Sequence, residues 1–135
     1  MAGLFVDTNI FLRHLLADHP EQSPRSTTFL RRVELGELHV VTAETVVFEV
    51  VFTLQRSYGL SREDIRDAVV PLINLPGVGL AGKRRLIRAF DLYVDYRLPF
   101  ADACHAAFME QHNLDEIVTF DREFDRLPSV SRVEP

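Results

Sequence analysis

Apolar and polar positions along this chain form two kinds of segment. Short apolar runs predict strands, and longer segments with apolar residues three or four positions apart predict helices. The predicted strands cover residues 4–6, 38–41 and 116–119, with shorter candidates at 76–80 and 130–133. The predicted helices cover residues 10–16, Pro24 or Ser26 to about 35, Thr42 or Glu44 to about 58, 62–73, 83–96, 101–112 and 121–127.

Residues typical of helix ends support several of these limits. Gly36 and Gly59 follow the second and third predicted helices, and Asn113 follows the sixth. Ser61 precedes the fourth helix with Asp64 three positions later, which resembles a capping box without its usual glutamate.

Strands that alternate with helices are typical of α/β proteins with a parallel sheet. We therefore expect a three-layer sandwich, with a central parallel sheet flanked by helices. No repeat or linker interrupts the chain, so residues 1–135 are predicted to form a single domain. Ligands of such sheets bind beyond the carboxyl ends of the strands. Asp7 and Asp121 directly follow predicted strands, so both should lie at that edge.

Composition narrows the possible classes of protein. The longest apolar stretches, residues 46–52 and 68–75, are interrupted and fall short of the ~20 residues that span a bilayer. The segment Met1-Ala2-Gly3 has no basic character typical of a signal peptide. The single cysteine, Cys104, excludes an internal disulfide and a cysteine-based zinc site. We expect a cytoplasmic protein with no membrane association.

The net charge of −5 argues against a simple nucleic-acid binder. However, carboxylates gathered around a cation would leave the remaining surface nearer neutral. Basic residues cluster at Arg31-Arg32 and at Lys83-Arg84-Arg85 with Arg88. These clusters are either phosphate contacts or ordinary solvated helix surfaces.

Four acidic residues stand in apolar surroundings, namely Asp7, Glu49, Asp102 and Asp121. Burying a carboxylate costs free energy unless something compensates its charge. A divalent cation can compensate several carboxylates at once, and oxygen ligands favour Mg²⁺ or Mn²⁺. Grouped carboxylates repel one another, so at least one should have a raised pKa without metal.

Each of these acids also has a purely structural interpretation. Asp7 and Asp121 could cap helices, and Asp102 in the first turn of its helix would be favoured by the helix dipole. Glu49 lies on a narrow polar stripe with Arg56, which either faces solvent or borders a pocket. Asp125 is a further candidate ligand whose participation stays open.

Four segments of the chain resemble the PIN-domain family, and most closely its VapC group of toxin ribonucleases. They are Asp7-Thr8-Asn9, Glu49 to Leu54, Phe100 to Ala103 with His105-Ala106-Ala107, and Thr119 to Phe124. The resemblance extends from Phe5 to Leu127. It implies an endoribonuclease that depends on Mg²⁺ or Mn²⁺, acts as a homodimer, and is the toxin of a type II toxin–antitoxin pair. A cognate antitoxin protein would block its site.

The resemblance also implies roles for the acids. Asp7, Glu49, Asp102 and Asp121 would be the catalytic and metal-binding residues, and a metal-activated water would hydrolyse the RNA phosphodiester bond. Thr8 and Asn9 would orient a carboxylate or a water beside the metal. Arginines near the acids would hold single-stranded RNA, and the candidates are Arg13, Arg25, Arg56 and Arg122.

Other functions remain open from the sequence. A catalytically silent RNA- or protein-binding domain would keep the acids without turnover. A metal-independent ribonuclease would need two histidines, and only His105 lies near a candidate acid, where packing in an alanine-rich helix is the other interpretation. A phosphate-receiver domain needs a late lysine, but the only lysine is Lys83. A DNA- or structure-specific nuclease on the same scaffold is a further alternative.

Overall fold

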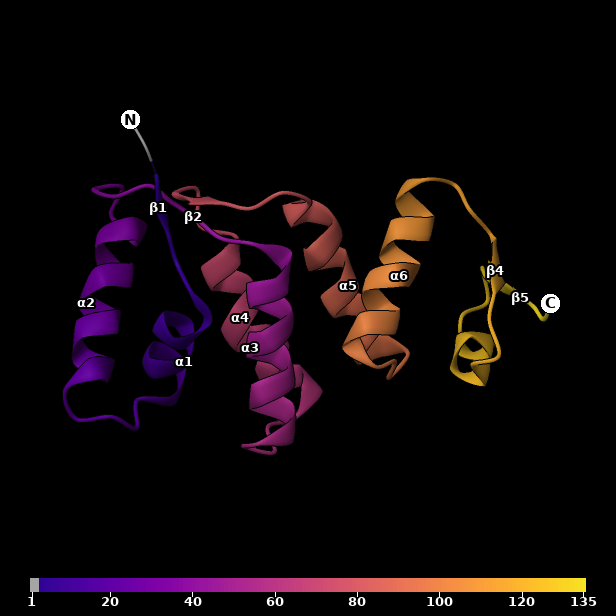
Figure 1. Cartoon of the computed structure of the whole chain (residues 1–135), viewed down its shortest axis with the longest axis horizontal. Coiled ribbons are helices and arrows are strands. Elements are labelled where there is room, and N and C mark those ends of the chain that lie inside the picture. The colour runs from indigo at the N-terminus through magenta and orange to yellow at the C-terminus, as the bar shows by residue number, and fades with distance from the viewer. Residues whose placement is uncertain (1–2) are drawn as a thin grey trace. The chain divides into compact units, whose positions relative to one another are not determined.

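The structure is a computed structural model that describes residues 3–135 (Figure 1). Two residues of the segment considered as a signal peptide, Met1 and Ala2, lie outside the described part. The α-helices are α1 (Thr8–Leu16), α2 (Gln22–Glu34), α3 (Glu44–Arg56), α4 (Arg62–Ile73), α5 (Lys83–Asp95) and α6 (Phe100–Gln111). A 3₁₀-helix, η1 (Arg122–Arg126), stands where a short α-helix was predicted.

All strand pairs in the described part are parallel, which confirms the α/β class. Strands β1 (Leu4–Phe5), β2 (Val40–Val41) and β3 (Val78–Gly79) form one sheet in that order. Strands β4 (Glu116–Val118) and β5 (Ser131–Val133) form a second sheet. Backbone hydrogen bonds extend the first sheet beyond the short strands, since Val6 N donates to Val41 O at 2.9 Å.

The chain divides into two compact units, of which the first ends at Lys83 and the second begins at Arg84. The three-stranded sheet belongs to the first unit and the two-stranded sheet to the second. A single domain over residues 1–135 stays a prediction.

The first unit has its core between helices α1, α3 and α4 and the sheet. Helix α1 packs on α2 and α3, and α3 packs on α4. Apolar residues at helical spacing on α3 and α4 supply much of this core, including Val47, Val51, Leu54, Ile65 and Ile73. The side chain of Thr42 is also buried and ties the end of β1 to β2, because its hydroxyl donates to Val6 O at 2.9 Å. The carboxyl end of β1, and hence Asp7, is held at this core.

The second unit has an aromatic core formed by Phe90, Tyr93 and Phe100. The ring of Phe100 lies 4.8 Å from Phe90 and 5.5 Å from Tyr93, measured between centroids. Such aromatic contacts add to the burial of apolar surface. Phe100 is the first residue of α6, so this core fixes the helix turn that carries Asp102.

The helix ends agree with the residues that predicted them. Gly36 and Gly59 take φ values of +79° and +63°, a left-handed conformation that favours glycine, and Asn113 takes +56°. Ser61 Oγ accepts a hydrogen bond from Asp64 N at 3.1 Å, which confirms the predicted cap. Helix α2 begins at Gln22, earlier than predicted, because proline is tolerated in the first turn, where Pro24 lies. Within residues 3–135, no helix is long and apolar enough to cross a membrane.

Candidate functional site

In the first unit, Thr8 connects two of the predicted acids. Asp7 caps α1, and its Oδ1 accepts a hydrogen bond from Thr8 N at 2.7 Å. The hydroxyl of Thr8 in turn donates to Glu49 Oε2 at 2.7 Å, across from α1 to α3. Thr8 is buried, with 7% of its surface exposed, so this bridge has a fixed position. The capping interpretation of Asp7 is confirmed, and its second carboxylate oxygen still has acceptor capacity.

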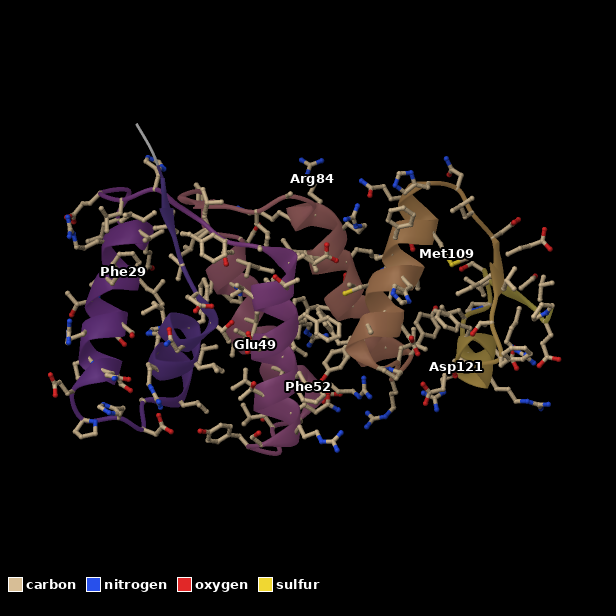
Figure 2. All side chains as sticks on the ribbon, in the orientation of Figure 1. Phe29, Glu49, Phe52, Arg84, Met109 and Asp121 are labelled. Carbon is tan, nitrogen blue, oxygen red and sulfur yellow. The ribbon has the colours of Figure 1, made fainter. Side chains whose placement is uncertain are left out.

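Glu49 lies on an exposed face of α3 that is not purely polar. Phe48 and Phe52 are 38% and 54% exposed on this helix, and the Arg56 guanidinium lies 5.7 Å from the centre of the Phe52 ring. Figure 2 shows Glu49 and Phe52 on the same helix. The exposure of Glu49 agrees with the solvent-facing interpretation of its stripe, while the bond from Thr8 holds one of its oxygens.

In the second unit, three carboxylates come together. Asp102, Asp121 and Glu123 each offer an oxygen, and these oxygens lie within 4.8 Å of one another. Asp121 caps η1, as its Oδ1 accepts from Glu123 N at 2.9 Å (Figure 2). Thr119 Oγ1 accepts from Asp121 N at 3.0 Å and fixes the backbone at the end of β4. Asp121 therefore both caps a helix and joins a carboxylate group.

The crowding of these carboxylates changes the proton affinity of Asp102. Partial burial, a hydrogen bond with Asp121 and the negative charges of Asp121 and Glu123 raise the pKa of Asp102 from 3.8 to about 6. The nearby His105 opposes this shift. The raised pKa agrees with the expectation that grouped carboxylates cannot all ionise easily without a cation.

Glu123 was not among the residues predicted to bind metal. A short helix was predicted to start at Asp121, with Asp125 as the extra candidate ligand. In the 3₁₀-helix, Glu123 joins the group, whereas Asp125 Oδ1 accepts from Arg132 Nε at 3.2 Å. The signal for Glu123 was its place two positions after a capping aspartate, where the cap bond draws the two residues together.

The interpretation of His105 as a packing residue is wrong. His105 is exposed, while Ala103, Ala106 and Ala107 are buried on the other side of α6. The helical period places His105 on the face of Asp102, three residues earlier.

The basic cluster at the start of α5 is largely occupied by local contacts. Arg88 Nε donates to Glu110 Oε1 at 3.0 Å, and this contact raises the pKa of Arg88. Arg85 donates to Gln111 Oε1 at 2.8 Å, and Lys83 Nζ donates to Leu75 O at 3.1 Å. These contacts favour a structural role for the cluster.

The carboxylate groups suit a hard divalent cation. The group in the second unit consists of carboxylate oxygens, the ligand type that Mg²⁺ and Mn²⁺ prefer. A cation there would relieve the repulsion that raises the pKa of Asp102. The structure thus joins Asp7 to Glu49 through Thr8 in one unit, and Asp102 to Asp121 in the other.

Fold and site together define a parallel α/β protein with carboxylates two and three residues after strands β1 and β4. The chain belongs to the PIN domain family, whose model matches residues 4–130.

Similarity to known proteins extends over nearly the whole chain. The chain is 25% identical over 122 residues to a VapC ribonuclease of Aquifex aeolicus, covering 90% of both chains. It is 28% identical over 134 residues to ribonuclease VapC13 of Mycobacterium tuberculosis, covering 96% of this chain and 98% of that one. The crystal structure of Mycobacterium tuberculosis VapC20, a sarcin-ricin loop cleaving toxin, aligns over 98% of this chain and 100% of its own, with 20% identity and a TM-score of 0.41.

Proposed function

We propose that this chain is a metal-dependent endoribonuclease and the toxin of a type II toxin–antitoxin pair. The observation that carries the proposal is the group of Asp102, Asp121 and Glu123 oxygens within 4.8 Å, in a chain that matches the PIN family from residue 4 to 130. Two relatives named VapC ribonuclease, aligned over most of their own length, support the RNA substrate. We propose that residues 1–135 act as one PIN domain.

Four acids predicted from the sequence are the proposed metal ligands. Asp7, Glu49, Asp102 and Asp121 would hold Mg²⁺ or Mn²⁺, and Glu123 would join them as a further ligand or as an acceptor for water. When bound, such a cation lowers the pKa of a water molecule and polarises the scissile phosphate. Oxygen donors of this kind bind Mg²⁺ while leaving several of its positions to water and substrate.

The residues of the chain would orient the reactants around that cation. Thr8 holds Glu49 Oε2, which leaves Glu49 Oε1 to bind the cation or to accept a hydrogen bond from the attacking water. The hydrogen bond from Thr8 N holds Asp7 Oδ1 in place. The other carboxylate oxygen of Asp7 would then be the one that binds the cation. In-line attack forms a bond from water oxygen to phosphorus and breaks the bond to the 3′ oxygen, which takes a proton. The products are a 5′ phosphate and a 3′ hydroxyl.

The partners follow from this activity. The proposed substrate is RNA. The protein would act in the cytoplasm as a homodimer, and a cognate antitoxin protein would block the acidic site. A basic side chain of the antitoxin would be attracted to the same carboxylates that repel one another in the free protein.

Cleavage of purified total RNA tests the proposal. Wild type, Asp7→Asn and Asp102→Asn are compared in Mg²⁺, in Mn²⁺ and in excess EDTA. Wild type should cleave with either metal and stop in EDTA, and both variants should lose activity by about 100-fold or more. Expression of wild type should arrest growth, and Asp7→Asn should not.

Three results would contradict the proposal. Persistent cleavage by a double Asp7→Asn, Asp102→Asn variant would refute the site. Cleavage in EDTA would favour histidine chemistry. RNA or protein binding by wild type without turnover in any metal would favour the silent binding domain.

A further inference from the structure

A cleft in the first unit is lined by residues from Asn9 to Phe29 that suit a nucleotide. It has a volume of about 400 Å³ and lies between α1 and α2. Helix α1 contributes Asn9 and Arg13, and helix α2 contributes Gln22, Arg25 and Phe29. Of these, Phe29 is labelled in Figure 2. This volume falls in the range of clefts that hold small ligands, ~300–1,000 Å³.

The charge of this lining differs from that of the chain. The chain has 20 acidic and 15 basic residues, yet the described residues lining the cleft include two arginines and no carboxylate. The arginines have ion-pair partners outside the lining, with Arg13 at 3.5 Å from Asp18 and Arg25 at 3.9 Å from Glu21. Both pairs are long and exposed, so a phosphate can compete for either guanidinium.

The polar and aromatic groups suit a base. Arg13 Nε donates to Gln22 Oε1 at 3.0 Å, which leaves the amide nitrogen of Gln22 to donate to a ligand. Asn9 adds a second amide with both a donor and an acceptor. The ring of Phe29 offers a flat apolar surface, and unpaired bases of single-stranded RNA stack on such rings.

The cleft and the proposed metal ligand Asp7 both belong to the start of helix α1. Asn9 follows Asp7 by two residues, about 3 Å along the helix axis, and Arg13 lies one turn further on the same face. The cleft therefore begins within one helical turn of the acid that the proposal places at the scissile phosphate.

We propose that the cleft between α1 and α2 binds one unstacked nucleotide of single-stranded RNA next to the cleavage position. Arg13 and Arg25 bind its phosphates, Phe29 stacks on its base, and Asn9 and Gln22 contact the base edge. The cleft thereby contributes to the choice of cleavage sequence. This inference rests on the proposed ribonuclease function, because it assigns part of the same substrate.

Fluorescence anisotropy tests the cleft without cleavage. The probe is a fluorescein-labelled single-stranded RNA of mixed sequence, about twelve nucleotides long, titrated with protein in EDTA at several salt concentrations. Arg25→Gln is matched by Arg32→Gln, which removes the same charge from an exposed position of α2 outside the cleft. Phe29→Leu keeps an apolar side chain but removes the ring. Circular dichroism spectra and melting temperatures check that each variant is folded.

Arg25→Gln should weaken RNA binding about tenfold and reduce the slope of log Kd against log salt by about one. Arg32→Gln should stay within about twofold of wild type. Phe29→Leu should weaken binding by about tenfold with an unchanged salt slope, because stacking releases no counterions.

Other outcomes would contradict nucleotide binding in this cleft. Equal effects of Arg25→Gln and Arg32→Gln would show that only general charge matters. Wild-type RNA affinity in both cleft variants would remove the cleft from RNA binding. Adding Mn²⁺ to the same samples separates the two proposals. RNA bound in the cleft but never cleaved refutes the ribonuclease, whereas cleavage with an unaltered KM in Arg25→Gln refutes the cleft alone.

Discussion

The hydroxyl of Thr8 donates a hydrogen bond to Glu49 Oε2 at 2.7 Å, which joins two acids 42 positions apart in the sequence. Thr8 also gives its backbone N–H to Asp7. One buried residue thus holds the two acids of the first unit that are proposed to bind metal. These two bonds suit a residue that positions the acids.

Replacing Thr8 by valine should separate this positioning from folding. Thr8→Val removes the hydroxyl and frees Glu49, so kcat should fall roughly 10- to 100-fold, as for losses beside metal ligands. The unfolding free energy should fall by about 1.5 kcal/mol at most, because Glu49 is exposed to water. Thr8→Ser keeps the hydroxyl and should retain most of the activity. Steady-state RNA cleavage and urea unfolding measure both effects, and wild-type kcat in Thr8→Val would remove Thr8 from the account.

The raised pKa of Asp102 predicts a pH-dependent stability in the metal-free protein. Its folded-state pKa of about 6 exceeds the ordinary value of 3.8, so the folded state binds the proton more tightly than the unfolded state. The resulting stabilisation is fully present below about pH 4 and is lost as the pH rises through 6. Asp102→Asn removes this dependence.

Urea unfolding in EDTA between about pH 4 and pH 8 measures it. The unfolding free energy of Asp102→Asn minus that of wild type should rise across this range. Asp125→Asn, which alters a carboxylate paired with Arg132, should show no such rise. A difference for Asp102→Asn that stays constant with pH would mean that the carboxylates do not interact.

Glu123 and Asp125 should differ in their effect on metal binding, although both lie on η1. Glu123→Gln removes a carboxylate from the group with Asp102 and Asp121, so Mn²⁺ affinity should fall roughly tenfold or more. Asp125→Asn should leave it nearly unchanged. Isothermal titration calorimetry gives both values. At Mn²⁺ equal to about 100 times Kd, wild type should gain about 2.7 kcal/mol of stability, and EDTA should reverse it. Equal affinities in the two variants would place Glu123 outside the site.

The aromatic core of the second unit should stabilise the turn that carries Asp102. Phe100→Ala removes a buried ring packed 4.8 Å from Phe90 and should lower the unfolding free energy by about 3–5 kcal/mol. Phe108→Ala, on an exposed position of the same helix, should cost about 1 kcal/mol or less. Chemical denaturation of the pair checks the contrast, and similar losses would show that this core does not support α6.

Local patterns were sufficient to predict the elements but not their pairing. The helical periods of residues 44–58 and 62–73 reflect one buried face each, so α3 and α4 lie close to the predicted ranges. Glycine and asparagine marked helix ends because these residues adopt the positive φ that follows a helix, which is a local preference. Which strands hydrogen-bond to one another depends on contacts distant in sequence, and the separate β4–β5 pair had no local signal.

Part of the candidate site was predicted from the sequence, and part was missed. Asp102 and Asp121 lie together, and a family resemblance indicated both. Glu123 escaped because a 3₁₀ turn, not an α-helix, follows Asp121 and changes which acid joins the group. His105 was assigned to packing from its alanine neighbours, yet their helical spacing turns them inward and His105 outward. The bond from Thr8 to Glu49 depends on how α1 meets α3, which no single segment contains.

Anomalous diffraction from a crystal soaked in Mn²⁺ tests most directly whether the proposed acids bind a cation. We expect an anomalous peak with carboxylate oxygens of Asp7, Asp102 and Asp121 at coordination distance, and with Glu49 bound directly or through a water. No peak, or a peak bound by the second-unit carboxylates alone with Asp7 and Glu49 outside its coordination sphere, would contradict the proposed nuclease site.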